Sequence, residues 1–461
     1  MMDLVPEIIR HVIFPLWLFK DGKGRVLKYL REFERSQFLT ESDIRERQLQ
    51  KLLLMVRHAY ANCEFYRRRL DDIGVRPSEI KDFRDYQKIP VLTKRDIQEN
   101  LNSLLAKNYP QEELVTNWTG GSTGSPLRFF HDKERMLSRE ASTLRHDAWA
   151  GHQIGQKLAV IWGHRQDLSI AQSFKARIRN ALLDRSRILD CSSMTDESMG
   201  QFANTLRVFR PRVILSYAVP MFLFARYCQT NRITDIRPLS IITSAEVLLE
   251  EERRTIEEVF GCRVFDRYGC REVAVIASEC EEHGSMHLNA ETLYVEFLNE
   301  EGNPVKPGEL GFIIITDLLN FGMPFIRYKI EDVGTPNDQH CPCGRGLPLM
   351  RMVAGRTTDF LRTPKGVRVS GTSLATYFIT SVPGIRQAQI VQDQIDHLVF
   401  KLVTGPEFRA TEAQLLREKA VDFFGEEMRY DIQHVEEIPK EASGKYRFSV
   451  CYLNDNHHIS S

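Results

Sequence analysis

One segment of the chain is built from residues that could bind phosphate. Residues 119–126 read Thr-Gly-Gly-Ser-Thr-Gly-Ser-Pro. Glycines such as Gly124 tolerate positive φ and let backbone N–H groups approach an anion, and the hydroxyls of Ser122, Thr123 and Ser125 are additional donors. The segment therefore predicts a loop that closes around the phosphates of a nucleotide. An ordinary surface loop is the alternative, because clusters of these residues are common in loops.

This segment lacks the lysine of a Walker-type phosphate loop, whose pattern is G-x-x-x-x-G-K-[ST]. Ser125 and Pro126 follow its last glycine instead. A positive charge for the terminal phosphates must therefore come from another part of the chain. Lys445, which ends the sequence Ser-Gly-Lys at 443–445, is the candidate, and a solvated surface lysine is the alternative.

Two short motifs could bind a metal ion. Cys280 and His283 form a C-x-x-H pair, and Cys341 and Cys343 form a C-x-C pair. Three thiolates and one imidazole are a donor set of closed, tetrahedral zinc sites. His287 competes with His283 for the fourth position. Because the pairs lie far apart in the sequence, two loops would have to meet, and reduced cysteines in ordinary loops are the alternative.

Composition restricts the class of protein. The 461 residues are 42% hydrophobic and 27% charged, and 62 basic residues balance 62 acidic ones. These values predict a globular chain of more than one domain and do not favour a nucleic-acid partner. The nine cysteines are an odd number, and we see no secretory signal, so reduced thiols or metal ligands are expected rather than disulfides. We expect a cytoplasmic protein.

An apolar run near the start of the chain needs separate consideration. Residues 12–19 are far fewer than the ~20 apolar residues of a spanning helix, and Pro15 interrupts them. No small-residue cleavage site follows, so the run is a poor signal peptide and we expect no transmembrane segment. We expect it to pack on the main domain, with contact to a membrane surface as the alternative.

The remaining patterns predict the elements that position these motifs. Apolar residues recur at helical spacing over 41–69. Short apolar runs then alternate with amphipathic stretches, which predicts βα units and a largely parallel sheet. Turn signals at 302–303 and 307–308 indicate a strand-rich part between 293 and 334. The apolar runs are 158–162, 213–217 and 239–243, and a last unit has a hairpin at 364–366, a strand at 388–391, a helix at 411–424 and a loop at 439–445.

Five motifs follow one another in a fixed order. They are the segment 119–126; Thr243-Ser244-Ala245-Glu246; Asp266-Arg267-Tyr268-Gly269-Cys270-Arg271-Glu272; 308–311 leading to Ile326-Arg327-Tyr328-Lys329-Ile330-Glu331-Asp332-Val333-Gly334; and Gly355-Arg356 through Asp359 with Gly366, completed by 443–445. This series resembles the adenylate-forming (ANL) superfamily. It is most similar to the phenylacetate-CoA ligase-like branch, which includes CapK-type capsular polysaccharide biosynthesis proteins. The resemblance covers nearly the whole chain.

The resemblance implies an α/β fold in two parts. A large N-terminal domain, residues 1–355, would contain a helical opening, βα-type sheets and a strand-rich lobe. A small, mobile α+β domain, residues 356–461, would carry the loop with Lys445. The implied activity is ATP-dependent conversion of a carboxylic acid to an acyl-adenylate with release of pyrophosphate, followed by transfer of the acyl group to CoA. Transfer to an amine or hydroxyl in polysaccharide modification and a catalytically silent nucleotide-binding member are the alternatives.

The resemblance also implies roles for single residues. The hydroxyls of residues 122–125 would hold the β- and γ-phosphates, with Thr123 among the catalytic groups. Glu272 would bind Mg²⁺, a hard cation that prefers oxygen ligands. Lys445 would reach the α-phosphate and the attacking carboxylate. A member that had lost Glu272 or Lys445 would be silent, and both are present.

The base and ribose of the nucleotide would be held by the middle motifs. Tyr268 offers a flat face to adenine, and Asp332 and Arg356 would bracket the ribose hydroxyls. Taken singly, Tyr268 could be a core aromatic, Glu272 a surface carboxylate, and Asp332 or Arg356 a turn or salt-bridge residue; their common order favours the site. The pocket would be completed by Ser244, Ala245, Glu246, Asp266, Arg267 and Gly269.

Two positions depart from the family pattern. Glu331 stands where the family usually has a glycine, which places a second carboxylate beside Asp332. Thr358, followed by Asp359, stands at the hinge position and puts the thioester half-reaction in question. We expect a small-molecule acid, ATP or AMP, CoA, Mg²⁺ and structural Zn²⁺ as ligands, since the branch often carries such a Cys/His cluster. The acid cannot be read from the sequence, and a homodimer is left open.

Overall fold

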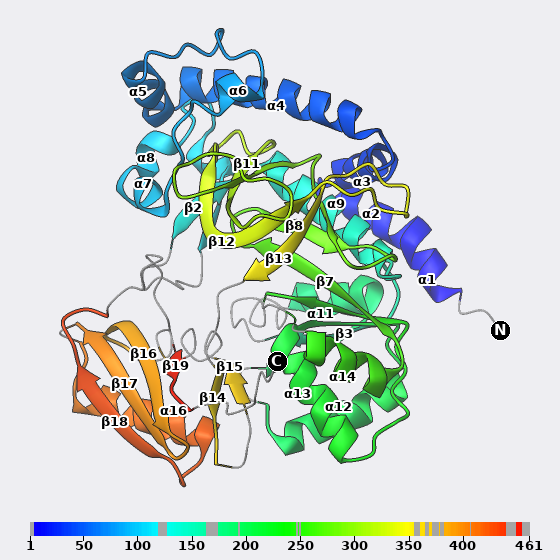
Figure 1. Ribbon diagram of the computed structural model, residues 1–461. Coiled ribbons are helices and arrows are strands. Elements are labelled where there is room, and N and C mark those ends of the chain that lie inside the picture. Colours follow the sequence, from blue (N-terminus) through cyan, green and yellow to red (C-terminus); the bar gives the residue numbers. More distant parts are fainter. Residues whose placement is uncertain are drawn as a thin grey trace, which may run out of the picture.

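The computed structural model describes residues 4–118, 127–162, 174–191, 194–245, 248, 250–354, 360–364, 368–370, 378, 382–405, 407–438 and 449–453. Helices begin this part of the chain and lie along one side of the molecule (Figure 1). They are α1 (Val5–Ile8), the π-helix η1 (Ile9–Ile13), α2 (Phe14–Lys20), α3 (Arg25–Ser36), α4 (Glu41–Asn62), α5 (Glu64–Asp72), α6 (Phe83–Tyr86), α7 (Lys94–Glu99) and α8 (Leu101–Leu104).

The predicted helical stretch 41–69 is confirmed and forms two helices, α4 and α5. Thr40 caps the start of α4 by accepting a hydrogen bond from the backbone N–H of Asp43. Cys63 then adopts an extended conformation, with φ −112° and ψ 119°, and ends α4. The chain resumes a helix as α5. Leu52 and Met55 of α4 and Tyr66 of α5 pack together in the main core.

The centre of the molecule is an eleven-stranded sheet in the order β10-β11-β12-β13-β9-β8-β7-β6-β5-β3-β4, counted over the described residues. The half of the sheet from β7 to β4 is parallel, as the apolar runs predict. The parallel strands are β3 (Leu158–Trp162), β4 (Ser186–Asp190), β5 (Val213–Tyr217), β6 (Ser240–Ser244) and β7 (Arg263–Cys270). The helices of this half are α11 (Phe174–Arg179), the π-helix η3 (Asn180–Asp184), α12 (Asp196–Phe209), α13 (Ala218–Thr230) and α14 (Glu250–Phe260).

From β7 onward the sheet is antiparallel, and this half is the expected strand-rich lobe. Its strands are β8 (Ala274–Glu279), β9 (Met286–Leu288), β10 (Leu293–Leu298), β11 (Gly311–Asp317), β12 (Tyr328–Asn337) and β13 (Leu349–Ala354). A short hairpin of β1 (Val115–Trp118) and β2 (Arg128–His131) precedes the sheet, after the 3-10 turn η2 (Gln111–Glu113).

Helix α9 (Lys133–Trp149) is the buried helix that connects these parts. Arg135 is fully buried, and its Nε lies 2.5 Å from Oδ2 of Asp317. Near the other end of the helix, Nη1 of Arg145 lies 2.5 Å from Oε1 of Glu291. A buried charge is tolerated when it is paired and hydrogen-bonded, so these two pairs hold α9 against β11 and against the turn before β10.

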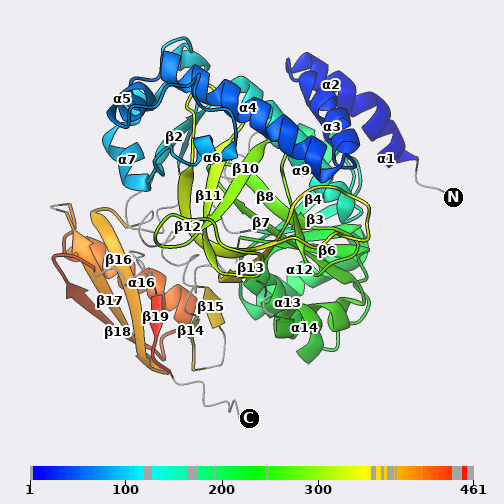
Figure 2. The ribbon, with the colours of Figure 1, turned by 45° about the horizontal axis from the view of Figure 1, so that its top comes forward.

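The last part of the chain forms a separate small α/β unit, which lies beside the large domain in both views (Figures 1 and 2). Its own core includes Phe378, Phe400 and Phe424. The expected α/β fold with a small C-terminal domain is therefore confirmed, while the boundary at 355–356 lies outside the described residues. The elements are β14 (Phe360–Arg362), β15 (Arg368–Ser370), β16 (Ile385–Gln394), β17 (His397–Thr404), α16 (Ala410–Phe424), β18 (Arg429–His434) and β19 (Ser449–Cys451), with the sheet order β18-β17-β16-β19.

Among the described residues, no helix has the length and apolar character needed to cross a bilayer. The apolar run 12–19 is half buried, because Phe14 and Leu18 pack in a core cluster while Val12, Leu16 and Phe19 face outward. The expected packing on the main domain therefore describes one face of this segment only.

Candidate active site and cysteine cluster

Part of the expected site lies outside the described residues. These positions are Ser122, Thr123, Gly124, Ser125, Glu246, Arg356 and Lys445. The ends of the hydroxyl-rich segment are nevertheless defined, because β1 and β2 pair antiparallel and place Trp118 opposite Arg128. The segment 119–126 therefore stands in the sequence between two strands that pair with each other.

The second and third motifs lie side by side. Strands β6 and β7 are parallel neighbours, so Thr243 pairs with Asp266 and Ser244 with Arg267. The hydroxyl of Thr243 donates to Oδ1 of Asp266 over 2.9 Å. Ala245 follows with φ 69°, a left-handed conformation that costs free energy for a residue with a Cβ atom. The carboxyl ends of parallel strands are the usual place for ligands in such sheets.

The third and fourth motifs are joined by a direct hydrogen bond. The hydroxyl of Tyr268 donates to Oδ2 of Asp332 over 2.8 Å, and the ring of Tyr268 is buried. Arg267 points to the opposite face, where its Nη2 lies 2.6 Å from Oδ1 of Asp147 in α9. Alternation along a strand explains this separation, and the structure does not bring the guanidinium of Arg267 to the other motif residues.

Gly269 has a packing reason within the same motif. A Cβ atom at this position would lie 2.5 Å from the carbonyl oxygen of Ala274, closer than such atoms approach. The glycine therefore permits the tight turn between β7 and β8, and this turn carries Glu272.

Glu272 is held at two points, by Tyr328 of the fourth motif and by His131, which the sequence did not indicate. The hydroxyl of Tyr328 donates to Oε1 of Glu272 over 3.1 Å. Nε2 of His131 lies 2.7 Å from the backbone carbonyl oxygen of Glu272, and Nη1 of Arg139 lies 2.9 Å from Nδ1 of His131. A guanidinium can only donate, so Nδ1 accepts and Nε2 carries the hydrogen that His131 donates to Glu272. The amide of Asn117 also approaches Nδ1, at 3.2 Å.

His131 remains neutral in this arrangement. Burial holds the pKa of His131 well below its usual value, and the nearby charges of Arg139 and Arg135 lower it further. His131 ends β2, the strand that follows the hydroxyl-rich segment. A single histidine in a strand carries no periodic signal, so only the fold reveals that it connects this strand to Glu272.

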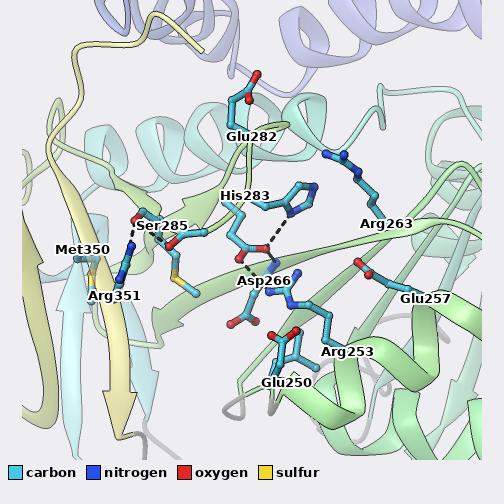
Figure 3. Close-up of a pocket in the computed structure, with 14 residues that line it drawn as sticks. Glu250, Arg253, Glu257, Arg263, Asp266, Glu282, His283, Ser285, Met350 and Arg351 are labelled. Atoms are coloured by element: carbon cyan, nitrogen blue, oxygen red, sulfur yellow. Dashed lines mark hydrogen bonds and ion pairs between the residues drawn. The ribbon is translucent and has the colours of Figure 1, made fainter. Parts of the chain in front are cut away.

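A polar cavity of about 510 Å³ lies beside the third motif (Figure 3). Asp266 lines it, and burial followed by the charge of Glu279 raises the pKa of Asp266 to about 7. Glu279 accepts hydrogen bonds from the backbone N–H of Asp266 and from Nη2 of Arg253, both over 2.8 Å. The cavity therefore offers a carboxylic acid at its wall that can accept or donate a hydrogen bond near neutral pH.

The two cysteine motifs meet in space, with His287 in place of His283 beside them. The ligand atoms of Cys280, His287, Cys341 and Cys343 all lie within 4.8 Å of one another. Sγ of Cys280 is 3.6 Å from Sγ of Cys341, and Nε2 of His287 is 3.3 Å from Sγ of Cys343. Two thiolates on a tetrahedral zinc ion lie about 3.8 Å apart, because each Zn–S bond is about 2.3 Å. The donors present therefore fit a closed zinc site.

His283 lies outside this group. The expectation that His283, with His287 as the alternate, is the fourth ligand is therefore corrected. Its Nδ1 is 3.3 Å from Oε2 of Glu279, and its ring packs on Phe265 with centroids 4.6 Å apart. His283 has φ 57°, so the chain turns sharply there and directs the imidazole to the cavity of Figure 3. His287 lies on β9, which pairs with β13 and so brings its ring close to the second cysteine pair.

The surroundings of the cluster orient its donors. Nδ1 of His287 lies 3.3 Å from the carbonyl oxygen of Leu347, which leaves Nε2 as the ligand atom. Burial lowers the pKa of His287 to about 4, so the ring is neutral as a metal ligand must be. Burial alone would raise the pKa of Cys343, but hydrogen bonds from Arg345 leave it below its usual value. The ring of Trp149, at the end of α9, packs 5.6 Å from that of His287.

Comparisons with known proteins agree with this arrangement. The CapK C-terminal domain family matches residues 361–451. A phenylacetate-coenzyme A ligase of Thermus thermophilus is 26% identical over 404 residues, which cover 83% of this chain and 87% of the relative. A phenylacetate-coenzyme A ligase of Pseudomonas putida is 26% identical over 72% of this chain and 74% of its own.

Solved structures agree on the fold. A 2-hydroxyisobutyryl-CoA ligase in complex with 2-HIB-AMP and CoA superposes with a TM-score of 0.63 at 18% identity, over 91% of both chains. The same enzyme in its postadenylation state gives a TM-score of 0.60. The chain is therefore a relative of the phenylacetate-CoA ligases that has the adenylate-forming ligase fold and carries a CapK C-terminal domain.

Proposed function

We propose that the protein is an AMP-forming acid–thiol ligase, which activates a carboxylic acid with ATP and transfers the acyl group to CoA. The observation that carries this proposal is the convergence of three separate motifs, through the hydrogen bonds of Thr243 to Asp266 and of Tyr268 to Asp332. It is supported by relatives named phenylacetate-CoA ligases and by a structural neighbour solved with an acyl-adenylate and CoA.

In the first half-reaction a carboxylate oxygen attacks the α-phosphorus of ATP, and pyrophosphate leaves. Two anions must approach each other, so the protein has to align the reactants and supply positive charge. We assign donors for the β- and γ-phosphates to Ser122, Thr123 and Ser125, and the cation at the α-phosphate to Lys445. Glu272 would hold Mg²⁺, and the bound ion would supply positive charge against the negative charge of the phosphates.

The nucleoside would lie at the carboxyl ends of β6 and β7. We assign the base to the pocket of Tyr268 and residues 244–246, with Asp266 at its polar wall. Asp332 and Arg356 would hold the ribose from two sides. The hydrogen bond from Tyr268 fixes the orientation of the Asp332 carboxylate, so the base and ribose sites are mechanically coupled.

In the second half-reaction the sulfur of CoA attacks the acyl carbonyl, a thioester forms and AMP leaves. The small C-terminal domain, which carries Lys445, would change position between the two steps.

We also propose that Cys280, His287, Cys341 and Cys343 bind one structural zinc ion. All four positions would then be filled by protein ligands, so this ion would stabilise loops and take no part in the chemistry.

A panel of carboxylic acids tests the function. The purified protein is incubated with ATP, Mg²⁺ and each acid, with and without CoA, while pyrophosphate, AMP and thioester are measured. We expect pyrophosphate release that depends on the acid, and thioester only when CoA is present. Acid-dependent release without CoA consumption would instead favour an amine or hydroxyl acceptor. No release with any acid would favour a nucleotide-binding protein without ligase activity.

A further inference from the structure

The first helices of the chain expose an apolar ridge. Large apolar side chains between 46% and 83% exposed follow one another along α1, η1 and α2 at spacings of three or four residues, which places them on one side of the helix. Single exposed apolar residues are common on protein surfaces, but a continuous row marks a contact surface. The ridge consists of Leu4, Val5, Ile8, Val12, Leu16 and Phe19.

The opposite side of the same segment is firmly packed. Ile9, Phe14 and Leu18 are buried in a cluster that includes Leu137 and Ala141 of α9. The ridge therefore points away from the body of the protein. The segment also lies at the edge of the molecule, away from the small C-terminal unit, in both views (Figures 1 and 2).

A line of cations lies on the neighbouring helix. Val26 and Phe33 of α3 are buried in the cluster that anchors α2, whereas Lys28, Arg31 and Arg35 are exposed. At 100° per residue these three side chains lie on the face of α3 opposite to Val26 and Phe33. Within the described part of the chain, no ion pair involves any of the three. The two helices thus form a hairpin whose outer face is apolar along one helix and cationic along the other.

The net charge of residues 20–35, which include most of the second helix of this hairpin, is also positive. Residues 20–35 contain six lysines and arginines and three acidic residues, although the whole chain has no net charge. Lys23 and Arg25 pair with Glu140 and Glu134 of α9, so they are directed to the protein. The other four cations of this stretch stand against Asp21, Glu32 and Glu34, of which Glu32 and Glu34 are exposed on α3, so one positive charge remains in excess.

We propose that this hairpin docks on the surface of an anionic lipid bilayer. The apolar ridge would enter the boundary between headgroups and acyl chains, and Lys28, Arg31 and Arg35 would contact anionic headgroups. The segment from α1 to α2 is about 24 Å long and lies along the protein, which suits a helix in the plane of the interface. A second copy of the chain fits this face less well, because twofold pairing would bring the same cations together.

Vesicle flotation tests the proposal on the ligand-free protein. Vesicles of phosphatidylcholine mixed with phosphatidylglycerol should carry the wild-type protein, with less binding at higher salt and little to phosphatidylcholine alone. The double variant Leu16→Ser/Phe19→Ser should bind at least about ten-fold more weakly. Lys28→Gln/Arg31→Gln should lose about five-fold for each charge, since one cation near such a surface contributes about 1 kcal/mol.

A matched control variant distinguishes binding through the ridge from non-specific binding by any exposed apolar side chain. Val208 on α12 is 85% exposed, so Val208→Ser removes an equally accessible apolar group elsewhere and should leave binding unchanged. The replaced side chains are exposed, so the thermal unfolding temperature should stay at the wild-type value.

Wild-type protein that does not bind anionic vesicles, or ridge variants that bind them equally well, would overturn the proposal. A dimer in light scattering that Leu16→Ser/Phe19→Ser abolishes, without vesicle binding, would assign the face to a second copy. None of these outcomes involves ATP, so they are independent of the ligase activity.

Discussion

Glu272 depends on neighbours at two different atoms. Tyr328 fixes its carboxylate, and His131 fixes its backbone carbonyl through a hydrogen whose position Arg139 determines. A residue that holds a metal-binding group in place affects the metal nearly as much as the ligand itself does. His131 is therefore a positioning residue: it would act through Glu272 and need not touch the substrate.

Replacement of His131 should weaken the use of Mg²⁺. In His131→Phe the donor to the Glu272 carbonyl is lost, and we expect the Mg²⁺ concentration for half-maximal adenylation to rise about 10- to 100-fold. His131→Asn keeps a donor and should recover part of the loss. Magnesium titrations of pyrophosphate release measure both variants, with the exposed His434→Phe as the control. A lower unfolding temperature with an unchanged Mg²⁺ requirement would reduce His131 to a purely structural group.

The choice between His283 and His287 illustrates what the sequence could and could not resolve. The motifs predicted three thiols and one imidazole, and the structure brings such a set together. The spacing C-x-x-H favours His283, but the backbone at His283 turns with φ 57° and directs its ring to Glu279. Only the pairing of β9 with β13 places His287 beside Cys343. A contact made by a strand pair distant in sequence leaves no local signal.

At the scale of elements, the prediction was best where one pattern decides the structure. The apolar runs 158–162 and 213–217 coincide with β3 and β5, and 239–243 differs from β6 by one residue. Apolar runs of this kind are typical of parallel strands whose faces are covered by helices, so their bounds lie close to those expected from the sequence. The helical pattern from 41 to 69 is confirmed by α4 and α5, but it does not show the break at Cys63, where the backbone is extended for one residue.

The cysteine cluster ties loops of the antiparallel half of the sheet. One loop follows β8 and the other precedes β13, so an ion bound there would fix two connections that have little other secondary structure. The cysteines of these two loops, far apart in sequence, pack together beside Trp149.

Loss of this ion should be measurable as lost stability. We expect about one zinc ion per wild-type chain by elemental analysis, and none in Cys343→Ser. The variant should unfold at a temperature several degrees lower, from a destabilisation of about 3 kcal/mol or more. Cys262→Ser, a free thiol outside the cluster, is the matched control and should change neither quantity. Zinc-free wild-type protein with full stability would remove the metal from the proposal.

At the scale of the molecule, the proposed reaction needs both domains. The motifs of the large domain gather around β6, β7 and β12, whereas the cation that we assign to the α-phosphate lies elsewhere in the chain. Lys445 belongs to the small domain, which has its own sheet and core. That the two domains share the reaction stays a prediction from the order of the motifs, and the docking of the two domains depends on surfaces that no motif encodes.

Removal of Lys445 should separate the two half-reactions. In Lys445→Ala we expect acid-dependent pyrophosphate exchange to fall about 10²- to 10³-fold, the usual effect of losing one charge-stabilising donor. Transfer of acyl groups from a supplied acyl-adenylate to CoA should fall much less, because no phosphate bond is made or broken by attack on the α-phosphorus in that step. Lys306→Ala, an exposed lysine of the large domain, serves as the control. An unchanged exchange rate would exclude Lys445 from the first step.

Helix α9 touches both regions on which these experiments act. Arg139 reaches His131 near the middle of the helix, and Trp149 packs on His287 at its end, about 15 Å farther along. A buried helix moves as a rigid body. If the cysteine cluster loosened, α9 would shift, and Arg139 would displace His131, which holds Glu272 in place. Protein without the metal ion would thus lose the alignment of Glu272 at temperatures well below that at which the chain unfolds.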